Sequence, residues 1–228
     1  MAYQFNALVI GLALLPAPGL ADPLQQQIVA GARSVADTDF AFTESTSAQR
    51  IGEPAKEFVI RYDPKRPSRW TLVRTEGRAP TPKETGDFQK RSAKRPVPSY
   101  ADIAKWFGAP AKRVAESRGS VTYRFATLPK GAIKLGNHDA SANTSAEAVV
   151  NTTGKTPFVE RVRFTSIKGF RMMMVAKIDR MDVTASYRMI AGNRPMIVAS
   201  AIDMSGSMLG KSGSFKTRTS YNDIRPTR

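Results

Sequence analysis

The chain has 228 residues, of which 41% are hydrophobic and 24% charged, a globular composition that excludes a wholly disordered protein. Its 35 Lys+Arg against 19 Asp+Glu give a net charge of +16, which favours anionic partners. The absence of cysteine excludes disulfides and lipid-modified cysteines, and the single histidine excludes a metal site built on several imidazoles.

Residues 1–21 have the features of a cleaved secretory signal. They carry no charged side chain, and the apolar run from Ala7 to Leu15 is followed by Gly19-Leu20-Ala21, whose small residues suit a signal peptidase. The run is too short to span a bilayer as a stable helix. We expect cleavage before Asp22 and export to a bacterial periplasm, with an N-terminal membrane anchor as the alternative.

The first third of the mature chain predicts helices and strands in alternation. Asp22-Pro23 supplies an N-cap and a proline for a short helix over residues 23–34. Alternating apolar residues predict strands at Phe40–Phe42, at residues 57–63 and at residues 69–74. Residues 75–98 hold four prolines, two glycines and six basic residues, which predicts a flexible basic loop.

A short helix over residues 99–107 is followed almost entirely by strands. The predicted strands span residues 121–128, 144–153, 158–166, 170–177, 181–189, 195–204 and 214–223. Short connections rich in turn formers join them, so successive strands should pair antiparallel as a meander. No crossover helices separate them, which excludes a Rossmann fold or a parallel α/β barrel. We therefore expect one mainly β (α+β) domain over residues 22–228.

Residues that would carry catalysis are scarce. His138 lies in a polar loop and is expected to be exposed, and no G-x-S-x-G serine motif occurs. The stretch 205–214 (SGSMLGKSGS) has one residue too few for a phosphate loop and no helix after it, so it predicts a hairpin turn. Asp179 and Asp182 are expected around a turn, and Glu160 is the one carboxylate predicted to point toward the concave side. We expect no enzyme activity, no catalytic residue, no metal and no cofactor.

Methionine is concentrated in one part of the sequence, with eight of the nine residues between Met172 and Met208. Thioether side chains adapt to varied ligands, so these strands predict an apolar cavity, with an ordinary core sealed by the helices as the alternative. The predicted cavity wall consists of Phe164, Phe170, Met172, Met174, Met189, Met196 and Met204.

The densest basic group is QKRSAKR, in the predicted loop. Its residues Lys90, Arg91, Lys94 and Arg95 are expected either to contact an anionic surface or to form an ordinary solvated face.

The order of these elements resembles the outer-membrane lipoprotein carrier (LolA-like) superfamily. A signal segment, a short helix (DPLQQQIVAGARS), a first strand (DFAFTES), an insertion of helix and loop and a long meander follow one another, and TPFVERVRF and SYNDIR are similar to stretches in exported proteins of this kind. The resemblance implies a curved antiparallel half-barrel whose concave apolar face is covered by two or three short helices. It also implies transport of lipids or lipid-modified proteins across the periplasm.

The expected protein is a monomeric, periplasmic carrier that binds a lipid or lipidated protein and has no nucleic-acid partner. An anionic envelope surface is a further expected partner. The alternative is a structural or interaction protein of the envelope, whose filled core supports a basic surface that binds polyanions or anionic membranes.

Overall fold

The computed structural model describes residues 22–35, 40–173, 176–190 and 194–227. The helices are α1 (Pro23–Ser34), α2 (Pro82–Ser92) and two 3-10 helices, η1 (Tyr100–Lys105) and η2 (Ser141–Asn143). The strands are β1 (Phe40–Arg50), β2 (Lys56–Tyr62), β3 (Trp70–Thr75), β4 (Lys112–Ser117), β5 (Ser120–Phe125), β6 (Lys134–Leu135), β7 (His138–Asp139), β8 (Thr144–Asn151), β9 (Phe158–Ser166), β10 (Phe170–Met173), β11 (Ala176–Ile190), β12 (Arg194–Met208) and β13 (Lys211–Pro226).

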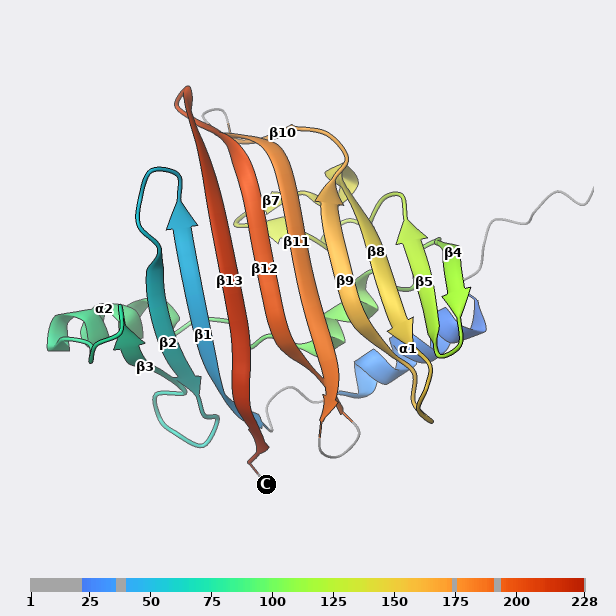
Figure 1. Cartoon of the computed structure of the whole chain (residues 1–228), viewed down its shortest axis with the longest axis horizontal. Coiled ribbons are helices and arrows are strands. Elements are labelled where there is room, and N and C mark those ends of the chain that lie inside the picture. Colours follow the sequence, from blue (N-terminus) through green and yellow to red (C-terminus); the bar gives the residue numbers. More distant parts are fainter. Residues whose placement is uncertain (1–21, 36–39, 174–175, 191–193, 228) are drawn as a thin grey trace, which may run out of the picture.

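One curved, open antiparallel sheet dominates the molecule, and its helices lie on a single face (Figure 1). The strand order is β3-β2-β1-β13-β12-β11-β9-β8-β5-β4, and β10 pairs with β11 beside this path. With β10 set aside, strands that follow one another therefore pair from β8 to β13, as a meander requires, and β9 pairs directly with β11. This confirms the mainly β fold class predicted from the sequence, whereas the predicted signal at residues 1–21 lies outside the described residues.

The face of the sheet that carries the helices, the covered face, has two separate apolar cores. The first core lies under α1 and η1 and contains Phe107, Tyr123 and Val162, while the second lies under α2 and contains Tyr62 and Trp70. The central strand β13 presents threonines to this face between them, since the Thr219 hydroxyl contacts that of Thr46 at 3.0 Å. The cores are therefore divided by a polar strip.

The start of α1 follows the sequence prediction. Asp22 is its N-cap, with its carboxylate accepting from the Gln25 amide at 2.9 Å and Pro23 in the first turn. The same carboxylate accepts from the Tyr123 hydroxyl at 2.9 Å and from Nε of Arg113 at 2.9 Å. These bonds hold α1 against the β4–β5 edge of the sheet.

The prediction of a loop over residues 75–98 is wrong for its central part, because residues 82–92 form the helix α2. The Thr81 side chain caps this helix, and the Glu84 carboxylate in turn accepts a hydrogen bond from the Thr81 amide at 2.7 Å. The residues T-P-K-E therefore form a capping box with proline in the first turn. Phe88 points inward and is buried in the second core. Proline content was the misleading signal here, since proline begins this helix.

The strands between residues 170 and 190 are also divided differently from the prediction. β11 runs unbroken from Ala176 to Ile190, so Asp179 and Asp182 lie within a strand and not around a turn. A register shift between Ile178 and Arg180 lets β11 continue alongside β12. Asp182 is held in mid-strand by an ion pair with Arg163 on β9.

Candidate functional site

An apolar pocket of about 650 Å³ opens at the end of the covered face, beside the β12–β13 turn. Two of the predicted cavity residues, Met172 and Met204, line it together with Ile178 and Phe215. Met204 lies opposite Met181 on β11 and Phe215 on β13, so these side chains share one face. The volume is in the range of small-molecule sites, about 300–1,000 Å³. We call it the end pocket.

The floor of the end pocket depends on a close approach of β11 and β12 at Gly206. A Cβ at this position would stand 2.1 Å from the carbonyl oxygen of Lys177, so only glycine fits without a movement of the backbone. Gly206 pairs with Ile178 immediately before the register shift in β11. The glycine thus permits the irregular pairing that shapes the floor.

The mouth of the end pocket is formed by apolar side chains that are exposed. Ile51 in the β1–β2 turn is 67% exposed, Met208 61% and Leu209 73%, and all three line the pocket. The Ile51 amide donates to the Ser214 carbonyl at 3.0 Å, which ties the β1–β2 turn to the start of β13. We call these three residues the apolar rim. They were not predicted from the sequence, although Leu209 beside Gly210 marks an apolar residue in a turn.

The other predicted wall residues lie elsewhere, which corrects the predicted cavity. Phe164 packs on Trp106, the residue that follows η1, with ring centroids 5.2 Å apart, and Met189 packs against the same first core. Met196 is buried in the second core, 4% exposed. Met174 lies outside the described residues. The helices thus close most of the predicted cavity and leave its end open.

Phe170 is buried under the ring of His138, which corrects the expectation that this histidine is exposed. The two rings stack with centroids 5.5 Å apart and an interplanar angle of 7°. Nε2 of His138 is buried without a hydrogen-bond partner among the described residues. The β6–β7 hairpin thereby covers the sheet beside the end pocket.

The predicted anionic contact residues fall into two groups. Lys90 and Arg91 lie on the exposed side of α2 and Lys94 follows it, also exposed. Nη2 of Arg95, by contrast, donates to both carboxylate oxygens of Glu44, at 2.6 and 2.7 Å, and its guanidinium lies 4.8 Å from the Trp70 ring. Arg95 is therefore engaged in an internal ion pair.

Glu44 is a carboxylate buried on the covered face, only 3% exposed, and it was not predicted as a site residue from the sequence. It accepts a third hydrogen bond from the Thr46 hydroxyl at 3.1 Å. Burial, and then the charge of Glu44, raises the pKa of the neighbouring Tyr221 to about 12. Glu160, which was predicted to point inward, is instead exposed and accepts from Asn151 at 3.4 Å.

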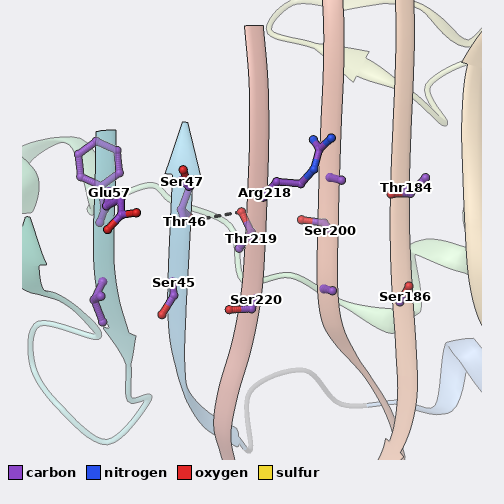
Figure 2. Close-up of a pocket in the computed structure, with 14 residues that line it drawn as sticks. Ser45, Thr46, Ser47, Glu57, Thr184, Ser186, Ser200, Arg218, Thr219 and Ser220 are labelled. Atoms are coloured by element: carbon purple, nitrogen blue, oxygen red, sulfur yellow. Dashed lines mark hydrogen bonds between the residues drawn. The ribbon is translucent and has the colours of Figure 1, made fainter. Parts of the chain in front are cut away.

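A second hollow, of about 560 Å³, lies over the central strands on the face without helices (Figure 2). Successive side chains of a strand point to opposite faces of the sheet. Glu44 and Tyr221 point to the covered face, so Ser45, Ser47 and Ser220 point to the other one, which we call the open face. The open-face residues that line the hollow are mostly small, with one acidic and one basic side chain among them: Ser45, Ser47, Glu57, Val59, Thr184, Ser186, Ala199, Ala201, Arg218 and Ser220.

Two further classes of site are absent from the described part of the chain. No group of three or more His, Asp or Glu side chains there is placed to hold a metal ion. No helix among the described residues is long and apolar enough to cross a membrane.

Comparison with solved structures finds similarity to the LolA superfamily protein NE2245 from Nitrosomonas europaea. The two chains share 11% sequence identity over 91% of this chain and 94% of that chain, with a TM-score of 0.36. No protein-family model matches the chain, and the search of curated proteins finds no match.

Proposed function

We propose that this protein is a non-enzymatic, periplasmic carrier that binds an acyl chain of a lipid or a lipidated protein in the end pocket. The observation that supports this proposal is an apolar pocket left open where the helices end, with Met172, Met204 and Phe215 in its wall. Flexible thioether side chains accommodate chains of different length and shape at low strain. The periplasmic location depends on the expected signal at residues 1–21.

A fatty-acid probe tests this function directly. Binding of cis-parinaric acid, followed by its fluorescence, should be saturable, and Met204→Gln should weaken it about tenfold, because an amide then faces the acyl chain. Met189→Gln is the matched control: it changes another half-buried methionine that packs on the first core outside the pocket. The control should lower the stability of the fold and leave the affinity for the probe unchanged.

The natural ligand is sought in protein purified from its native envelope. Solvent extraction should release lipid, and native mass spectrometry should show a bound mass. A bare mass, together with probe binding that does not saturate, would refute the proposal.

The alternative function is polyanion binding, and the open-face hollow is the observation that favours it. Arg218 lines this hollow together with serine hydroxyls and the carboxylate of Glu57. Among the described residues, its Nη1 donates to the backbone carbonyls of Ile202 at 3.3 Å and Thr217 at 3.0 Å. Salt separates the two functions, since polyanion binding weakens steeply with ionic strength and acyl-chain binding hardly changes.

A further inference from the structure

Exposed apolar side chains of this protein gather around the mouth of the end pocket. Six large apolar side chains of the described chain are strongly exposed, and three of them form the apolar rim: Ile51, Met208 and Leu209. Scattered apolar residues on a surface are ordinary, but a contiguous group at the mouth of a pocket marks a contact surface.

The backbone at Leu209 gives a second, independent reason to assign a role to the rim. Met208 pairs with Lys211, so Leu209 and Gly210 form a tight turn with φ of +51° and +76°. A turn of this kind favours Asn-Gly, because asparagine tolerates positive φ better than leucine. Leu209 is therefore unfavourable for the backbone and is also 73% exposed. Neither the stability of the turn nor solubility accounts for a leucine here.

The charges around the rim are mainly positive. Arg50, Lys177 and Lys211 line the end pocket, against the single acid Glu53. Lys177 pairs with Asp179 at 2.6 Å, whereas neither Arg50 nor Lys211 has an ion-pair partner in the described part of the chain. Exposed apolar residues flanked by basic ones match the interface of an anionic bilayer, where the apolar groups insert and the cations meet lipid phosphates.

We propose that the apolar rim docks on an anionic lipid bilayer, with Met208 and Leu209 inserted at the level of the headgroups and Arg50 and Lys211 on the phosphates. Docked in this way, the mouth of the end pocket opens onto the membrane, and an acyl chain can pass between them without crossing water. The inference deepens the proposed function, but the docking itself requires no ligand in the pocket.

Vesicle flotation tests the docking. The purified protein should float with vesicles of phosphatidylglycerol and phosphatidylethanolamine and much less with pure phosphatidylcholine. Leu209→Asn should weaken the affinity of the protein for the anionic vesicles about tenfold, since it removes one inserted apolar side chain. Because asparagine suits the positive φ, this variant should keep or raise the melting temperature, so that lost binding cannot be ascribed to misfolding.

Two exposed valines provide matched controls away from the rim. Val73 on β3 is 44% exposed and Val114 on β4 is 41% exposed, and neither lines the end pocket. Val73→Ser and Val114→Ser should bind vesicles like the unchanged protein. Lys211→Glu should weaken binding to anionic vesicles and leave the residual binding to phosphatidylcholine unaltered.

Three results would overturn the docking: no flotation with anionic vesicles, unchanged flotation of Leu209→Asn, or an equal loss in the valine controls. A dimer in solution that Leu209→Asn abolishes would assign the rim to a second copy of the chain, and would also overturn it. Failure of the pocket is distinguishable from failure of the docking, because Met204→Gln should bind cis-parinaric acid about tenfold more weakly and still float like the unchanged protein.

Discussion

Replacing Arg95 by alanine is expected to destabilise the fold by about 3 kcal/mol. The Glu44 side chain is 4% exposed and would keep only the Thr46 hydroxyl as a partner once Arg95 is removed. Breaking a buried ion pair from one side costs about 3–5 kcal/mol, because the remaining charge is left uncompensated. Arg95 is 34% exposed, so water enters the space it leaves and places the cost near the lower limit.

Urea unfolding followed by tryptophan fluorescence measures this cost, since Trp70 lies under the Arg95 guanidinium. A loss of about 3 kcal/mol corresponds to a fall of about 6–12 °C in melting temperature for a chain of this size. The double variant Glu44→Leu with Arg95→Met should recover most of the stability, because an apolar replacement of a buried pair is often neutral. A loss below about 1 kcal/mol in Arg95→Ala, the range of surface pairs, would refute the reasoning.

Gly206→Ala should cost about 1–3 kcal/mol, because its Cβ would stand 2.1 Å from the Lys177 carbonyl oxygen. In the same urea assay Gly213→Ala, whose Cβ meets nothing nearer than 3.9 Å, should be close to neutral, and equal losses would contradict the close approach. The hydrogen bond from Arg78, followed by that from the Thr81 amide, lowers the pKa of Glu84 from 4.5 to about 2. Its stabilisation of α2 should therefore be complete above pH 4.5 and disappear as the pH falls through about 2. Hydrogen exchange of the α2 amides as a function of pH measures this loss of stability. A midpoint near pH 4.5 in an NMR titration of the Glu84 carboxyl group would contradict the prediction.

The alternation of apolar and polar residues predicted the strands well, because successive side chains point to opposite faces of the sheet and the covered face is the buried one. Met172 and Met204 were assigned to a common apolar face on this ground, and both line the end pocket. The same alternation could not separate them from Met189 and Met196, since it sets the face of a residue and not its position beneath the helices. Which methionines remain accessible depends on where α1, η1 and the β6–β7 hairpin lie.

Contacts between distant segments explain the remaining differences. Glu44 is one of several polar residues in β1, so the sequence alone does not mark it as buried. Its partner Arg95 lies 51 residues away in a stretch that was predicted to be a loop. The apolar rim was missed for a related reason. Ile51 and Leu209 lie in turns, where alternation carries no information, and only the pairing of β1 with β13 brings them to one mouth.

The position of β13 has a consequence for how the chain assembles during synthesis. This strand lies between β1 and β12, and the register joins Phe40 to Pro226, almost the full length of the chain apart. Until residues 211–226 have emerged, β1–β3 cannot join the rest of the sheet, and both β1 and β12 wait with an open edge. Such long-range pairing folds slowly, and open edges invite aggregation in the meantime. A chain shortened before β13 should therefore yield two unjoined sheet fragments that depend on chaperones, not a smaller version of the same protein.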